Sequence, residues 1–377
     1  MNYLTDLRVP KSARHPSNSL WYGVILLAPA LFLMSQLIPP LHAQDPPGSA
    51  LLNPQAIVFN PAKKKAYVVD RAHSAVYVIH AGTQEQHRVP VGAGPVSIGV
   101  NTRTGRAYAI NAADGTASVI DGDTDVVIAT VAIGSHPYSI AVNSATGLAY
   151  ISHTFSDQTT ILDCATNAVS DLRTGSSDLI TIDPDRNLVY LMGYESSTLT
   201  VLDGASRSLS LIPVGMHQWG LTFEEGAGSV YVARTGAAEV AVLKRFSPVP
   251  EAIPTGHIPC ALAFNQKMHR AYVANYGDNS VTVIDTRLDR AIATVPAGNR
   301  PQAITFDAVR NLVLVANTHD DIVTVMDGST YEVLETLPAG RHPYALAVDS
   351  DSGSLYVANL EGDRPYTTVN LRGIRKP

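Results

Sequence analysis

The chain has 377 residues, of which 45% are hydrophobic and 16% are charged, so it can bury a sizeable core and is not intrinsically disordered. Its formal net charge of -6 at pH 7 argues against a polyanionic partner such as nucleic acid. The 16 tyrosines, 27 glycines and 24 prolines are spread along the chain, which is typical of an all-β fold with many turns.

The first 43 residues differ from the rest. Arg8, Lys11 and Arg14 precede an uncharged apolar run over residues 20–38, and Ala43 follows a Pro-containing stretch. This order predicts a secretory signal peptide over residues 1–43. The apolar run is nearly long enough to span a bilayer, so an uncleaved N-terminal membrane anchor is the alternative. In either case we expect bacterial-type export to the periplasm, the cell surface or the medium, with no membrane contact beyond this segment.

From residue 54 onward the sequence repeats itself. The segment KAYVVD around Tyr67 recurs as RAYAIN, LAYISH, LVYLMG, SVYVAR, RAYVAN, LVLVAN and SLYVAN, at spacings of 40 to 42 residues. Each copy belongs to a unit of four short runs rich in Val, Ile, Ala and Tyr, bounded by Asn, Asp, Gly or Pro. A four-stranded antiparallel unit of about 41 residues has the size of a propeller blade. The repeat therefore predicts an all-β protein, a β-propeller over residues 54–377.

The repeat count sets the number of blades. The repeats begin near Pro54, Pro95, Pro137, Ser177, Gln218, Pro259, Pro301 and Pro343. This predicts eight blades, with seven blades and a partial extra repeat as the alternative. The last repeat ends before a fourth strand. We expect residues 44–53 to be a linker whose segment SALLN, residues 49–53, supplies that strand and closes the ring.

The phrases YVANYGDNSVTVID, VIDGDTDVVIATVAIGSHP and PYALAVDSDSGSLYVAN resemble the YVTN family of β-propeller repeat proteins. The resemblance covers residues 54 to about 370. It implies an extracytoplasmic or cell-surface propeller, usually a binding protein. Related propellers include lactonases, antibiotic lyases and redox subunits, so the resemblance supports the fold more strongly than any activity.

With the strands of a blade lettered a to d, the a–b and c–d turns lie on one face of the ring, which we call the turn face. Five carboxylates there end strand c, namely Asp121, Asp163, Asp203, Asp285 and Asp327. Aspartate side chains commonly bind nearby backbone N–H groups in such turns. We therefore interpret these five as structural turn residues and not as a metal or acid–base site.

The b–c loops and the d–a connections lie on the other face, which we call the d–a face. It gathers histidines from the connections and from the b–c loops, where His73, His153 and His319 are found. Arg234 stands where most repeats have Asn, and Trp219 follows His217. Loops at the centre of a propeller are natural binding sites. The candidate ligand-binding residues are His136, His153, His217, Trp219, Arg234, His257, Arg300 and His342.

The sequence carries no GxSxG, HExxH, CxxCH or phosphate-loop motif. We predict an exported binding scaffold for a ligand, an envelope polymer or a protein partner, monomeric and without a catalytic centre or cofactor. The alternative is a lactonase-like hydrolase or lyase that holds a divalent metal through His136, His217, His257 or His342. DNA binding is a third reading, which the acidic balance disfavours. We expect the two cysteines, three repeats apart, to be unpaired.

Overall fold

The computed structural model describes residues 54–245, 247, 249–362 and 365–374. The chain divides at Ala43 into two units, and every described residue belongs to the second unit, Gln44–Pro377. The predicted signal peptide or anchor and the predicted linker with its ring-closing strand therefore lie outside the described residues. In the described part of the chain, no helix is long and apolar enough to cross a membrane.

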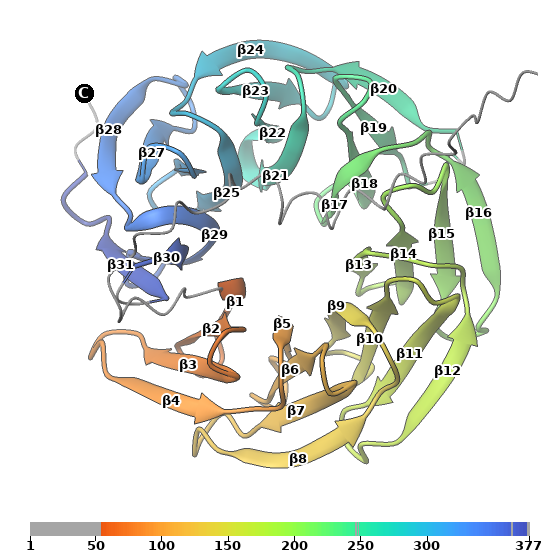
Figure 1. The fold of residues 1–377 in the computed structure, drawn as a ribbon. Coiled ribbons are helices and arrows are strands. Elements are labelled where there is room, and N and C mark those ends of the chain that lie inside the picture. The colour runs from red at the N-terminus through yellow and green to blue at the C-terminus, as the bar shows by residue number, and fades with distance from the viewer. Residues whose placement is uncertain (1–53, 246, 248, 363–364, 375–377) are drawn as a thin grey trace, which may run out of the picture. The chain divides into compact units, whose positions relative to one another are not determined.

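Eight antiparallel sheets follow one another along the chain and surround a common axis, which confirms the eight-bladed propeller (Figure 1). Strand a of each blade lies nearest the axis. The a strands are β1 (Pro54–Asn60), β5 (Pro95–Val100), β9 (Pro137–Asn143), β13 (Leu179–Asp183), β17 (Gln218–Glu224), β21 (Pro259–Asn265), β25 (Pro301–Asp307) and β29 (Arg341–Asp349). The b strands are β2 (Lys65–Asp70), β6 (Ala107–Asn111), β10 (Leu148–His153), β14 (Leu188–Met192), β18 (Ser229–Arg234), β22 (Arg270–Asn275), β26 (Leu312–Asn317) and β30 (Ser354–Glu361).

Strands c and d complete each sheet toward the outside of the ring. The c strands are β3 (Ala75–His80), β7 (Thr116–Ile120), β11 (Gln158–Asp163), β15 (Thr198–Asp203), β19 (Glu239–Leu243), β23 (Ser280–Asp285), β27 (Ile322–Asp327) and β31 (Tyr366–Asn370). The d strands are β4 (Gln86–Pro90), β8 (Val127–Ala132), β12 (Val169–Arg173), β16 (Leu209–Pro213), β20 (Glu251–Pro254), β24 (Arg290–Pro296) and β28 (Val333–Pro338). A short 3-10 turn, η1 (Gln266–Met268), lies in the a–b turn of blade six.

The last blade has three strands among the described residues, as predicted, and it packs directly against the first. Ala66 and Val68 of β2 form one buried cluster with Tyr356 and Ala358 of β30. The ring of Phe59 stacks on that of Tyr356 with 6.1 Å between the centroids. The ring therefore closes through contacts between blades one and eight within the described residues.

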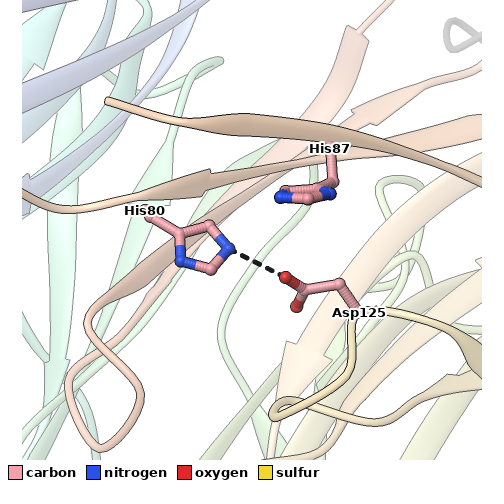
Figure 2. Close-up of side chains that lie close together, drawn as sticks. All are labelled: His80, His87 and Asp125. Carbon is pink, nitrogen blue, oxygen red and sulfur yellow. Dashed lines mark hydrogen bonds and ion pairs between the residues drawn. The ribbon is translucent and has the colours of Figure 1, made fainter. Parts of the chain in front are cut away.

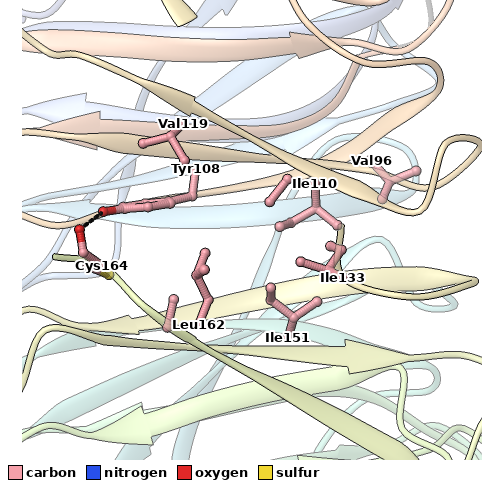
Figure 3. Close-up of a cluster of buried hydrophobic side chains, with 10 residues drawn as sticks. Val96, Tyr108, Ile110, Val119, Ile133, Ile151, Leu162 and Cys164 are labelled. Atoms are coloured by element: carbon pink, nitrogen blue, oxygen red, sulfur yellow. Dashed lines mark hydrogen bonds between the residues drawn. The ribbon is translucent and has the colours of Figure 1, made fainter. Parts of the chain in front are cut away.

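The hydrophobic core lies between neighbouring blades. Figure 3 shows the cluster where Tyr108 and Ile110 of blade two pack against Ile151 and Leu162 of blade three. The Tyr108 hydroxyl donates a hydrogen bond of 3.3 Å to the backbone oxygen of Cys164 in the next blade. The repeat tyrosine is buried between blades in each copy that contains it, and in Tyr108, Tyr150 and Tyr272 its hydroxyl also forms a hydrogen bond to the next blade. Both cysteines are buried and unpaired, as predicted.

The carboxylates on the turn face have the predicted structural role. Asp121 Oδ1 accepts hydrogen bonds of 3.0 Å from the backbone N–H groups of Asp123 and Thr124. These bonds lower the pKa of the Asp121 carboxyl group, because they stabilise its charged form. The same pair of turn bonds recurs at Asp163, Asp203, Asp285 and Asp327. Five turns of one design explain the repetition without any shared chemistry.

Candidate functional site

The backbone of the d–a face is held by hydrogen bonds between each d–a connection and the neighbouring b–c loop. Thr318 N donates to Arg300 O at 3.1 Å, and Arg300 N donates to Asn279 Oδ1 at 2.9 Å. Each connection has one or two residues with positive φ, and among these are His136, His217, Arg300 and His342, with φ between 51° and 61°. The loops are therefore fixed through their backbones, and these four side chains remain available for contacts outside the sheet.

His153 is a structural residue and not an exposed candidate. It is buried, its Nδ1 lies 2.8 Å from Ser135 O, and its Nε2 lies 2.9 Å from Thr160 Oγ1. Asn275 has the same place in blade six, where its Nδ2 donates to Thr282 Oγ1 at 2.9 Å. His153 therefore replaces the asparagine that ties strand b to strand c, and both ring nitrogens are already engaged.

Arg234 occupies the corresponding position in blade five and also faces its own sheet. Its guanidinium forms an ion pair with Glu239 at the start of strand c. Both side chains are about three-quarters buried, with 25% and 22% exposed. This ion pair replaces the hydrogen bond that asparagine forms between strands b and c in other blades. The guanidinium of Arg234 is therefore engaged within blade five.

Three of the predicted histidines lie apart from one another, each beside a partner from its own pair of loops. The His136 ring meets Phe155 edge-on at 6.2 Å, and the His217 ring meets Tyr194 at 5.6 Å. His257 Nδ1 lies 2.9 Å from a carboxylate oxygen of Asp278. Among the described residues, none of these histidines belongs to a group of three metal-ligand atoms that lie within 4.8 Å of one another.

The structure brings three of the predicted residues, Trp219, Arg300 and His342, into one continuous row with Tyr276 and His319. We call these five residues the binding arc. The Trp219 and Tyr276 ring centroids are 5.7 Å apart, and the Arg300 guanidinium carbon lies 5.3 Å from the Tyr276 centroid. The His319 and His342 rings meet edge-on at 6.2 Å. The arc crosses blades five to eight, so residues far apart in the sequence share one site.

Arg300 is the centre of the arc and has uncharged partners. Its Nη1 donates to the Tyr276 hydroxyl at 3.0 Å and lies 3.4 Å from His319 Nε2. In the described part of the chain, no carboxylate oxygen lies within 4.0 Å of this guanidinium. At the far end, His342 Nδ1 lies 3.5 Å from Glu361 Oε2. The arc therefore presents an exposed cation beside two aromatic rings in a protein that is acidic as a whole.

The charge of Arg300 also acts on His319. Partial burial and the neighbouring Arg300 and His342 lower the pKa of the His319 imidazole. A neutral His319 can accept the Arg300 hydrogen bond at Nε2 while its proton stays on Nδ1. The bond and the lowered pKa therefore support each other.

We expect Arg300→Gln to raise the pKa of His319, because the substitution removes a positive charge beside the imidazole. An NMR titration of the His319 ring protons measures the change. Arg287→Gln, at an exposed arginine in a c–d turn on the other face, is the matched control and should leave the titration as it is. A His319 titration unchanged in Arg300→Gln would contradict the electrostatic coupling.

Two members of the arc, Tyr276 and His319, were not among the candidate residues from the sequence. Tyr276 follows the last residue of a b strand, in the position that Thr318 has in the next blade. His319 is one of the b–c loop histidines that the sequence placed on this face. Tyr276 lies in the b–c loop of blade six and His319 in that of blade seven, and Arg300 lies in the connection between these two blades. Aligning the b–c loops of these two repeats with that connection would have placed both residues beside Arg300.

No family model matches the sequence, and none of the curated proteins matches it either. Solved structures do. A chain described as Kuenenia stuttgartiensis hydrazine synthase superposes with a TM-score of 0.60 and 17% identity, covering 78% of this chain and 99% of that one. The dihydro-heme d1 dehydrogenase NirN in complex with DHE has a TM-score of 0.58 and 15% identity, covering 69% of this chain and 59% of that one. At these identities the likeness shows the propeller fold alone.

Proposed function

We propose that the chain is an exported, monomeric β-propeller of the YVTN-repeat type that acts as a binding scaffold. Its ligand is an anionic saccharide of the cell envelope, bound on the d–a face by the binding arc. The basic and apolar N-terminal segment supports export, and the repeat phrases support the family. The scaffold needs no catalytic centre of its own, because its task is to hold the ligand on a rigid ring.

The observation that carries this proposal is the exposed Arg300 guanidinium beside the Tyr276 ring. Guanidinium groups bind carboxylates in a planar, two-point geometry, and the bond is strong because both partners are charged. Trp219 and Tyr276 pack in part against the core cluster of blades six and seven and are only partly buried, so a sugar ring can pack against their exposed parts next to that charge. A carboxylated sugar matches both parts of the arc.

The pH dependence of binding should follow from His319. A bound anion stabilises the protonated imidazole, so the affinity for the anion should increase as the pH falls and His319 takes up a proton. Because the pKa of His319 is lowered in the free protein, this increase should continue as the pH falls and level off only below the range of an ordinary histidine.

Arg300→Ala is expected to weaken the binding of glucuronate by roughly 10-fold to 100-fold, the range for a lost hydrogen bond to a charged group. Isothermal titration calorimetry measures the affinity, and thermal shift provides a second readout, since a ligand stabilises by RT ln(1 + [L]/Kd). Glucose is the uncharged control ligand, and Arg287→Ala is the control variant. Absence of glucuronate binding to the wild-type protein, or equal binding to Arg300→Ala, would reject this proposal.

A further inference from the structure

A second cluster of chemically capable side chains lies on the outer part of the turn face, where blade one meets blade two. His80 ends β3, His87 lies in β4, and Asp125 lies in the c–d turn of blade two (Figure 2). One ligand atom from each residue lies within 4.8 Å of the others. His80 Nε2 is 2.8 Å from Asp125 Oδ2, and the two imidazole centroids are 5.3 Å apart. Within the described residues this is the one such group of three.

The repeat shows what this position does elsewhere. His80 replaces the aspartate that ends strand c in five other blades, and in blade five Lys244 replaces it. Lys244 Nζ lies 2.9 Å from Glu251 Oε1 and 2.8 Å from Asp289 Oδ2. In blade five the three positions therefore hold a cation between two carboxylates.

The two clusters occupy the same places in their repeats. His87 pairs with Val78 of strand c, and Glu251 pairs with the equivalent Val242. Asp125 and Asp289 are each the fourth residue after the aspartate that caps their turn, and both have positive φ, 56° and 48°. Where blade five has one cation and two carboxylates, blade one thus has two imidazoles and one carboxylate. These three groups are all metal ligands, with no side-chain cation at the place that Lys244 fills.

We propose that His80, His87 and Asp125 bind a divalent transition metal, Zn²⁺ in the first place, which ties blade one to blade two. Imidazole nitrogen and carboxylate oxygen are regular zinc ligands, and two histidines favour zinc over calcium or magnesium. The metal takes the role that the Lys244 ammonium has between blades five and six.

The carboxylate of Asp125 is already oriented for this role. Lys65 Nζ, itself buried, donates to Asp125 Oδ1 and to Gly122 O, each at 2.8 Å. The other oxygen, Oδ2, is turned toward His80. A partner that holds the far side of a ligand in this way fixes its direction and is a usual feature of metal sites. The charge of Lys65 opposes that of a bound cation, so His80 and His87 must supply much of the affinity.

Metal binding requires the tautomer of His80 that leaves Nε2 without a proton. A neutral His80 that now holds its hydrogen between Nε2 and Asp125 Oδ2 would carry it on Nδ1 instead, so that Nε2 and Oδ2 are both free to bind Zn²⁺ at about 2.0–2.2 Å. His87 Nε2 also lies 3.3 Å from Glu85 Oε1, and the side chains of His87 and Glu85 are 47% and 63% exposed. A water or Glu85 can therefore complete the coordination from the solvent side.

The test is a Zn²⁺ titration of the full chain, purified without a polyhistidine tag, followed by calorimetry. We expect one Zn²⁺ per chain and a loss of Zn²⁺ affinity of more than about 10-fold in His87→Gln. Substitution of a residue that only hydrogen-bonds to a metal ligand already lowers metal affinity by about that factor. His87 lies on an outer strand and is half exposed, so this variant should fold. His269→Gln, in the a–b turn of blade six on the same face, is the matched control and should bind Zn²⁺ like the wild type.

Electron paramagnetic resonance of the Cu²⁺-loaded protein locates the metal. The wild type should show coupling to two imidazole nitrogens and His87→Gln to one. A wild-type chain that takes up no Zn²⁺, or a His87→Gln variant with unchanged affinity and unchanged Cu²⁺ spectrum, would overturn the proposal. Neither outcome bears on glucuronate binding by the arc, which lies on the other face.

Discussion

Tyr272→Ala is expected to lower the free energy of unfolding by about 3–5 kcal/mol, the usual cost of deleting a buried aromatic side chain. Tyr272 is fully buried between blades six and seven, and its ring stacks on Phe306 with 6.0 Å between the centroids. Its hydroxyl donates a 2.7 Å hydrogen bond to Gly328 O of the next blade. The substitution therefore removes packing and a bond between two blades at once.

Tyr276→Ala is the matched control, because this half-buried tyrosine of the binding arc lies four residues further along the same repeat. Urea unfolding followed by fluorescence measures both variants. Tyr276→Ala should lower the free energy of unfolding less than Tyr272→Ala does, because Tyr276 packs only partly against the core, and it should bind glucuronate more weakly. Tyr272→Ala should lose more stability and should affect glucuronate binding less. Equal unfolding midpoints for the two variants would contradict the assignment of Tyr272 to the core and Tyr276 to the site.

The fold could be predicted from the sequence because each blade packs against the next through similar residues at the same positions of the repeat. A side chain in strand b must fill the space against the next blade, and an aspartate after strand c satisfies the turn, so the tyrosine returns in seven of the eight repeats and the aspartate in five. Counting these markers gave the eight blades and the start of each to within two residues, for example Arg341 in place of Pro343. The predicted closing strand lies outside the described residues and stays a prediction.

For the candidate site, the sequence predicted only the face of the propeller on which each residue lies. Alternation of strands assigned residues to a face, but it could not say which loops meet, because the separation of neighbouring blades depends on their packing. Trp219, Tyr276 and Arg300 therefore came together only in the structure. The grouping of His153 with the exposed candidates was wrong, because this side chain is buried. It hydrogen-bonds to Thr160, seven residues later, as Asn275 does to Thr282 in blade six, and a comparison of these two repeats would have shown its structural role.

The metal proposal rests on two positions at which the sequence departs from the repeat. His80 and Lys244 each stand where five other blades have a turn aspartate, and each reaches instead to an aspartate of the following blade. His80 and Lys244 cannot accept the turn hydrogen bonds as the aspartate does, so the role of each must come from other partners. In blade five that partner set is complete within the chain, and in blade one it is a set of metal ligands.

Lys65→Met is expected to lower the free energy of unfolding by about 3–5 kcal/mol, the cost of breaking a buried ion pair from one side. Lys65 and Asp125 are almost fully buried, with 7% and 6% of their side chains exposed, and their charged atoms are 2.8 Å apart. Removing the ammonium group leaves the carboxylate without its buried counter-charge, since a neutral His80 offers only a hydrogen bond.

The chain contains a close control for this substitution. Lys63 pairs with Asp123 between the same two turns, at 2.5 Å, with 25% and 72% of the side chains exposed. Lys63→Met should therefore cost only about 0–1 kcal/mol, as exposed ion pairs do. In Lys65→Met/Asp125→Leu no charge is left unpaired, so much of the lost stability should return. Equal losses in Lys65→Met and Lys63→Met would show that Asp125 is not held as a buried charge, and the orientation on which zinc binding relies would fail with it.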